Sequence, residues 1–231
     1  MSTIKENLSR CLDRIESSAV KAGKRGSDIT LVAVSKMVEP ALINEGIEAG
    51  IQVIGENKVQ EAQAKRELVN PISWHMVGHL QSNKVKTAIQ IFDMIQSVDS
   101  VGVAEEISKR CGLLHKTLPL LVEVNTSGEP SKFGCQPEEV EALVTRISSL
   151  PDIRVEGLMT VGLFSSEENK VRKCFILLRQ LAEKIRTLRL PGVDMRVLSM
   201  GMSGDFELAI AEGSTMVRIG SAIFGPRLYL R

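Results

Sequence analysis

Two patterns of apolar residues alternate along this chain, one with helical spacing and one in short continuous runs. The first helical pattern spans 4–19, and its apolar members are Ile4, Leu8, Leu12, Ile15 and Ala19. The run at 30–34 (TLVAV) is apolar and rich in β-branched residues, which is typical of a strand covered on both faces. Similar runs predict strands at 52–55, 73–78, 94–98, 118–124, 154–160, 194–200 and 215–219. Helical spacing returns between them, most clearly at 136–149 and 171–188.

Eight strands, each preceded by a helix, predict an α/β fold with a parallel sheet. The number eight favours closure into a single (β/α)8 barrel of the TIM type with an extra N-terminal helix. A doubly wound open sheet is the alternative. No linker or low-complexity tract interrupts the pattern, so we expect residues 1–231 to form one domain. In such a barrel the functional residues follow the C-terminal ends of the strands.

The charge balance argues against two classes of partner. The 231 residues contain 29 Lys and Arg against 28 Asp and Glu, and only one Trp, one Tyr and six Phe. We therefore expect neither nucleic-acid nor membrane binding. The four cysteines, Cys11, Cys111, Cys135 and Cys174, are scattered and form no C-x-x-C motif, which favours reduced thiols and a cytoplasmic protein. No exposed apolar stripe stands out, so we expect a monomer.

Lys36 is the first candidate for chemistry. It continues the alternate-residue face of Val32 and Val34, so it points into the barrel mouth if that face is internal. A buried lysine is costly unless it is paired or used. Desolvation lowers its pKa, and the neutral amine can form a Schiff base with a carbonyl compound. The alternative is an ordinary solvated lysine at the end of a strand.

Two small-residue turns, after the seventh and eighth strands, form the second candidate. The segments 199–205 (SMGMSGD) and 218–221 (RIGS) each leave a strand and enter a helix. Their backbone N–H groups and hydroxyls suit an anion, and barrels often bind phosphate between these two loops. The alternative is that such residues simply begin helices.

A lysine and a phosphate site in one barrel mouth predict a phosphorylated carbonyl ligand. Pyridoxal 5′-phosphate fits this description, and so does the substrate of a sugar-phosphate aldolase.

His75 lies on a predicted strand and His79 lies at its end. Residues four apart on a strand are about 13 Å apart, so these two histidines cannot share a metal ion. We predict no metal site, although His79 at the strand's end can still face the ligand.

At this point several motifs resemble those of one known family. They are Leu31-Val-Ala-Val-Ser-Lys36, Ile54-Gly-Glu-Asn57 with Gln60-Glu61, Trp74-His75, Gly78-His79-Leu-Gln-Ser-Asn-Lys84, Gly157-Leu-Met159, Leu198-Ser-Met-Gly-Met-Ser203, Gly213-Ser-Thr-Met-Val-Arg-Ile-Gly220 and Phe224-Gly225. Together, and in this order, they resemble the pyridoxal phosphate homeostasis protein family over about residues 29–226.

The resemblance implies a barrel like the alanine racemase N-terminal domain, with pyridoxal 5′-phosphate held as a Schiff base on Lys36. It implies a phosphate site at Ser199, Gly201, Met202, Ser203, Gly220 and Ser221. Asn57 would lie near the cofactor, and Arg218 would lie near its ring nitrogen or its phosphate. Members of the family are regarded as non-catalytic carriers or regulators of the vitamin B6 pool, so apo-enzymes that need the cofactor, or amino acids, are possible partners.

A small racemase or decarboxylase is the alternative function. A racemase of this barrel type uses a second base, a tyrosine from an additional β domain. A chain of 231 residues leaves no room for that domain, and its one tyrosine is Tyr229. We therefore expect a binding protein without catalytic residues.

Overall fold

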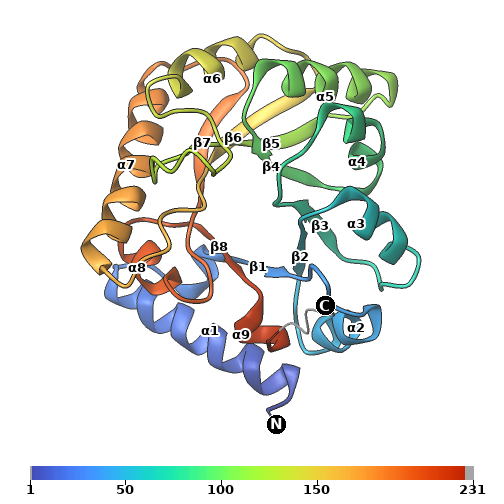
Figure 1. Ribbon diagram of the computed structural model, residues 1–231, viewed down its shortest axis with the longest axis vertical. Helices are drawn as coiled ribbons and strands as arrows, with labels where there is room; N and C mark the ends of the chain where they lie inside the picture. Colours follow the sequence, from blue (N-terminus) through green and yellow to red (C-terminus); the bar gives the residue numbers. More distant parts are fainter. Residues whose placement is uncertain (1, 227–231) are drawn as a thin grey trace.

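The computed structural model describes residues 2–226, and their strands close into a barrel (Figure 1). The strands are β1 (Thr30–Val34), β2 (Val53–Glu56), β3 (Ser73–Met76), β4 (Met94–Val98), β5 (Leu118–Glu123), β6 (Ile153–Met159), β7 (Val193–Ser199) and β8 (Met216–Ile219). Each pairs in parallel with the next, and β8 pairs with β1. The predicted barrel is confirmed and the open-sheet alternative is wrong.

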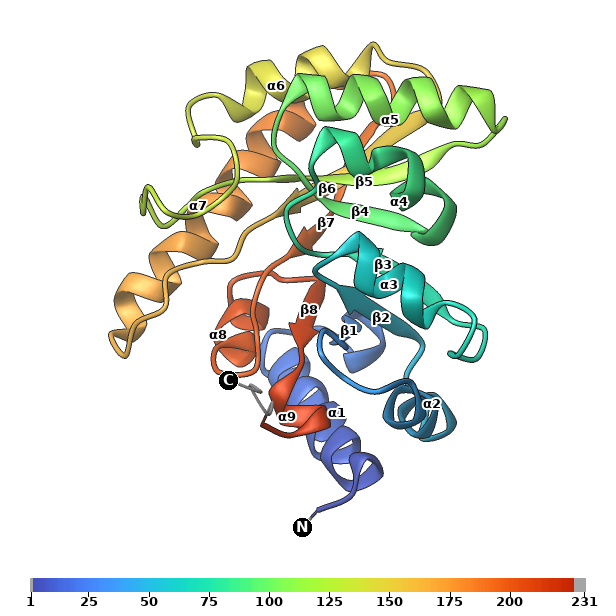
Figure 2. The same ribbon diagram turned by 45° about the vertical axis from the view of Figure 1, so that its right-hand side comes forward.

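Helices surround the barrel on its outer side (Figure 2). They are α1 (Ile4–Lys21), α2 (Pro40–Glu48), α3 (Val59–Lys65), α4 (Val85–Ile91), α5 (Val101–Leu113), α6 (Val140–Ser148), α7 (Glu168–Thr187), α8 (Phe206–Ala211) and α9 (Ser221–Phe224). Among the described residues no helix is long and apolar enough to span a membrane. The four cysteines are buried thiols without disulfides.

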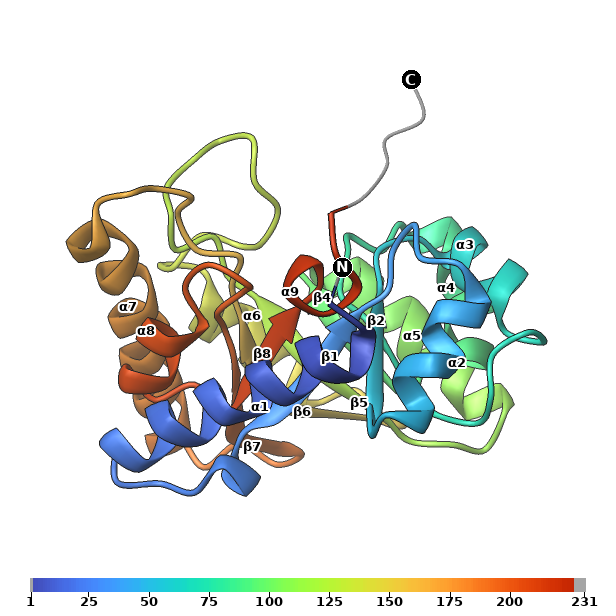
Figure 3. The same cartoon turned by 90° about the horizontal axis from the view of Figure 1, so that it is seen from below.

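The predicted N-terminal helix packs outside the barrel, against α8, α9 and α2 (Figure 3). A capping box at Thr3 and Glu6 begins it, and Ile4, Leu8, Cys11, Ile15 and Ala19 form its buried face. Leu12 is 46% exposed, so its predicted place on that face is wrong. It lies about 80° around the helix from Ile4, at the edge of the apolar arc.

The strands bury two separate layers of side chains because successive residues point to opposite faces. Val32 belongs to a small interior cluster with Met94, Leu121, Met159 and Met216, whereas its neighbour Ala33 packs in the outer layer beneath the helices. The interior assignment of the Val32 face is therefore confirmed. It directs the next residues of that face toward the C-terminal mouth of the barrel.

Candidate functional site

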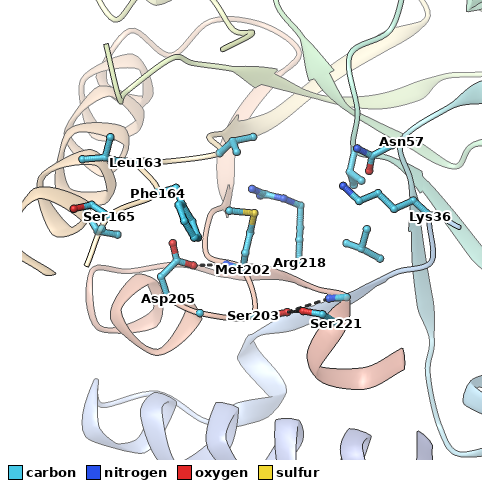
Figure 4. Close-up of a pocket in the computed structure, with 16 residues that line it drawn as sticks. Lys36, Asn57, Leu163, Phe164, Ser165, Met202, Ser203, Asp205, Arg218 and Ser221 are labelled. Carbon is cyan, nitrogen blue, oxygen red and sulfur yellow. Dashed lines mark hydrogen bonds between the residues drawn. The ribbon is translucent and has the colours of Figure 1, made fainter. Parts of the chain in front are cut away.

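A cavity of about 590 Å³ opens at the C-terminal ends of the strands. Its walls come from the loops after β1, β2, β3, β6, β7 and β8, which is the end of the barrel that the sequence indicates. Lys36 and Asn57 stand on one side, and the Ser203 and Ser221 loops stand on another (Figure 4).

Lys36 is half-buried and lines the cavity together with Val34. Ser35, between them, faces the opposite way and is fully buried in the outer layer. Asn57 reaches the same wall because its loop runs against Gly78, where a Cβ would lie only 2.4 Å from the Asn57 carbonyl oxygen. A side chain at position 78 would therefore push Asn57 away from Lys36.

The loops after β7 and β8 meet through their serines. The Gly220 N–H donates to Ser203 Oγ at 3.3 Å, and Ser221 Oγ lies 3.4 Å from Ser203 Oγ. Asp205 accepts the Met202 N–H at 2.5 Å and so fixes the first loop. The helices that follow have only six and four residues, so the hydroxyls and loop N–H groups, rather than a helix dipole, are the donors that this wall offers to an anion.

Arg218 provides a positive charge at the cavity wall, and hydrogen bonds on the side away from the cavity fix its position. Its guanidinium donates to Ser199 Oγ at 2.7 Å and to the Thr160 carbonyl at 2.7 Å. Burial lowers the pKa of Arg218 to about 10, while the negative charges of Glu123 and Asp205 act in the opposite direction. Arg218 therefore stays protonated at neutral pH.

A series of hydrogen-bonded polar side chains crosses the barrel interior and ends at Arg218. Ser199 Oγ donates to Gln96 Oε1 at 2.6 Å, and Gln96 Nε2 lies 2.9 Å from His75 Nδ1. Burial lowers the pKa of His75 to about 4, so its ring is neutral at physiological pH. This series fixes the orientation of the guanidinium. Sequence reasoning missed Gln96. Its polar side chain within an otherwise largely apolar predicted strand could have marked it as a candidate.

The structure brings together most of the predicted cofactor-binding residues. Those that line the cavity are Lys36, Asn57, Met202, Ser203, Arg218, Gly220 and Ser221. Ser199 is completely buried behind Arg218, so its hydroxyl contacts the guanidinium rather than the cavity. Gly201 has φ +95°, and a Cβ there would lie 2.6 Å from the Ala209 Cβ, so it allows close packing of the loop.

His79 also lies outside the cavity lining. Its ring stacks on Phe133 with centroids 4.1 Å apart, and its Nδ1 is 3.2 Å from Asp99 Oδ2. Sequence reasoning missed the loop after β6, where Leu163, Phe164 and Ser165 form one wall. The loop directly follows the predicted strand 154–160, and this position alone could have marked it as a candidate for the cavity wall. Asp205 was missed as a lining residue although it belongs to the predicted turn.

Among the described residues, no three His, Cys, Asp or Glu side chains gather as metal ligands. The donors at this mouth are instead one amine, one guanidinium, one side-chain amide, several hydroxyls and backbone N–H groups. An amine facing an anion cradle can capture a carbonyl compound that also carries a phosphate.

Comparison with known proteins gives matches over nearly the whole chain. The sequence model described as "Alanine racemase, N-terminal domain" matches residues 4–227. A pyridoxal phosphate homeostasis protein of Pseudomonas aeruginosa is 41% identical, with 99% of this chain and 98% of the relative aligned. The protein of the same name from Aquifex aeolicus is 40% identical over 97% of this chain and 98% of its own length.

Solved structures agree with the sequence matches. An unknown protein from Bifidobacterium adolescentis has a TM-score of 0.91 at 41% identity, covering 96% of this chain and 94% of the other. PipY of Synechococcus elongatus with PLP bound has a TM-score of 0.83 at 32% identity, covering 96% of this chain and 100% of its own. Clostridium difficile alanine racemase, at 17% identity and a TM-score of 0.77, aligns over 97% of this chain and 58% of its own, and shows the shared fold. Since the match extends along nearly the full length at about 40% identity, the chain belongs to the pyridoxal phosphate homeostasis protein family.

Proposed function

We propose that this protein binds pyridoxal 5′-phosphate in the cavity as a non-catalytic carrier or regulator of the cofactor pool. The observation that carries this proposal is that Lys36 and the Ser203–Ser221 hydroxyl pair lie on different walls of one cavity, which Arg218 also lines (Figure 4). The names of the relatives support it, and so does the related PipY structure with PLP bound.

The residues present fit the chemistry of this cofactor. When bound, the cofactor supplies an aldehyde and a phosphate, which are the two groups that an amine and an anion cradle recognise. We assign the aldehyde to the Lys36 amine, which would hold it through a C=N bond, with the carbonyl oxygen released as water. We assign the phosphate to the N–H groups and hydroxyls around Ser203, Gly204, Gly220 and Ser221. A Cβ at Gly204 would meet no atom within 4 Å, so this segment of backbone is open to a ligand.

Binding can be tested directly by titration of the purified protein with pyridoxal 5′-phosphate. We expect one equivalent to remain after gel filtration and to show the absorbance of a Schiff base. Retention of less than a tenth of an equivalent under saturating conditions would overturn the proposal.

Ser203→Ala should weaken binding of the phosphorylated cofactor about tenfold, because a hydrogen bond to a charged group contributes roughly 1.5 kcal/mol or more. Unphosphorylated pyridoxal should bind the variant as it binds the wild type. Both dissociation constants can be measured by absorbance titration. Ser165→Ala is the matched control, because Ser165 lines the cavity from the loop after β6. This substitution should change neither dissociation constant. An equal loss for both ligands would place the phosphate elsewhere.

The carrier proposal is supported by the sparse set of bases at the cavity. Within the described part of the lining, the ionisable side chains are Lys36, Asp205 and Arg218. Arg218 stays protonated, and the Asp205 carboxylate already accepts the Met202 N–H. Burial raises the pKa of Asp205, opposed mainly by that hydrogen bond. Tyr229, the one tyrosine of the sequence, lies outside the described residues.

We therefore expect no meaningful turnover of amino acids. Proton abstraction from an amino acid needs a positioned base, which is worth about 10²–10⁴-fold in rate. The holo-protein would be incubated with L- and D-alanine in deuterated water, and exchange of the α-proton followed by NMR. We expect rates far below about 1 s⁻¹, the lower end of typical enzymes. Faster exchange would favour the racemase or decarboxylase alternative, and its loss in Asp205→Asn would identify the second base.

A further inference from the structure

Two acidic residues of the segment 54–61 do not face the cavity. Glu56, the last residue of β2, and Glu61, in α3, converge behind β1 on the side chain of Lys65. The Lys65 ammonium donates to Glu56 Oε1 at 2.9 Å, to Glu61 Oε1 at 2.6 Å and to the Ser35 carbonyl at 2.9 Å. All three donor positions of the ammonium are therefore used.

Two members of this cluster, Glu56 and Lys65, are buried in the layer between the barrel and its helices, and the Glu61 side chain is 23% exposed. Glu56 is fully buried and Lys65 is 7% exposed. Burial of such charges is costly unless they are paired and hydrogen-bonded, and removal of one partner leaves the others uncompensated. Burial raises the pKa of Glu56, and the charge of Lys65 is the largest influence that lowers it. Lys65 forms an ion pair with each of the two carboxylates.

The cluster binds the backbone on both sides of Lys36. On the N-terminal side, Lys65 binds the Ser35 carbonyl, and Ser35 Oγ donates to Glu56 Oε1 at 2.7 Å. On the C-terminal side, the Met37 N–H donates to Glu61 Oε1. Met37 has φ +59°, a left-handed conformation that is uncommon for a residue with a side chain. The Glu61 carboxylate thus holds a strained turn directly after Lys36.

We propose that Lys65 is a positioning residue that fixes the Lys36 backbone so that the lysine amine meets the cofactor aldehyde. This inference rests on the proposed function, since it presupposes the Schiff base at Lys36. A ligand whose phosphate is already bound presents its aldehyde at one place, and the reaction with Lys36 is favoured only if the amine is held within reach. Without Lys65, the turn at 35–37 gains conformational freedom. The bound ligand then spends less time joined to Lys36, while the phosphate cradle on the other wall keeps its hydrogen bonds.

The test compares two ligands on Lys65→Met. Pyridoxal 5′-phosphate can form the Schiff base, whereas pyridoxine 5′-phosphate carries an alcohol at the same position and cannot. We expect the variant to bind the aldehyde about 5- to 20-fold more weakly, with a reduced Schiff-base absorbance at saturation, and to bind the alcohol within about twofold of the wild type. Lys116→Met is the matched control, because Lys116 also donates to a backbone carbonyl, that of Ile89, but lies before β5 at the other end of the barrel.

Each outcome separates the inference from the proposed function. Equal losses for the two ligands in Lys65→Met, or no loss for the aldehyde, would overturn the positioning role. Lys36→Ala is measured in parallel: if that variant keeps the Schiff-base absorbance, the assignment of the aldehyde to Lys36 fails, whereas the proposed function fails if the wild-type protein retains less than a tenth of an equivalent of the cofactor. Should Lys65→Met not fold, Glu61→Gln retains the fold more readily because the amide oxygen can still accept the Met37 N–H. It should show the same ligand selectivity at about 2- to 5-fold.

Discussion

Lys36→Ala should abolish covalent capture of pyridoxal 5′-phosphate while the barrel stays folded. The amine is the group that we assign to the aldehyde, and the half-buried side chain lines a cavity rather than filling the core. The Schiff-base absorbance should fall to background, and the free energy of unfolding should change by no more than about 1 kcal/mol. Absorbance titration and denaturant unfolding measure these two quantities.

Lys58→Ala is the control for this substitution, because Lys58 is exposed and directly follows Asn57. It should leave the absorbance unchanged. A Lys36→Ala protein that still develops the full Schiff-base absorbance would contradict the assignment. Loss of the absorbance in Lys58→Ala instead would move the reactive amine to the loop after β2.

Arg218→Met should weaken binding of pyridoxal 5′-phosphate roughly 10- to 150-fold, which corresponds to one charge-assisted hydrogen bond of about 1.5–3 kcal/mol. The guanidinium is turned toward the Thr160 carbonyl and away from the Ser203–Ser221 pair (Figure 4). We therefore expect Arg218 to contact the ring side of the cofactor, so that unphosphorylated pyridoxal also loses affinity. Titration with both ligands measures this.

Stability must be measured in the same variant, because Arg218 is buried and its removal leaves Ser199 and Thr160 without their donor. Arg218→Lys keeps the charge and serves as the control for folding. A loss restricted to the phosphorylated ligand would assign Arg218 to the phosphate. Unchanged affinity for both would remove it from the site.

The barrel could be predicted because its strands are short, apolar and separated by helical patterns. The strand predicted at 118–124, for example, is observed at Leu118–Glu123, and the strand predicted at 154–160 is observed at Ile153–Met159. Helix starts were less accurate: 136–149 is helical only from Val140, because residues 136–139 form a turn in which the Glu139 N–H donates to the Gln136 carbonyl. Local turn chemistry overrides apolar spacing at such ends.

The site could be predicted only as far as strand ends determine it. Alternation along β1 was enough to place Lys36 at the cavity, and the small-residue turns placed Ser203 and Ser221 there. The sequence pattern could not show that Ser199 lies behind Arg218, or that His79 stacks on Phe133, because those contacts join segments distant in sequence. The expectations of a monomer, a cytoplasmic location and a single domain over 1–231 stay predictions.

The lysine that holds the cofactor can be identified by chemical reduction of the Schiff base. The protein would be saturated with pyridoxal 5′-phosphate, reduced with borohydride, digested and analysed by mass spectrometry for the modified peptide. Reduction makes the C–N bond permanent, so the label marks the lysine that held the aldehyde. We expect the label on Lys36. A label on Lys58, Lys84 or another lysine, with Lys36 unmodified, would contradict it.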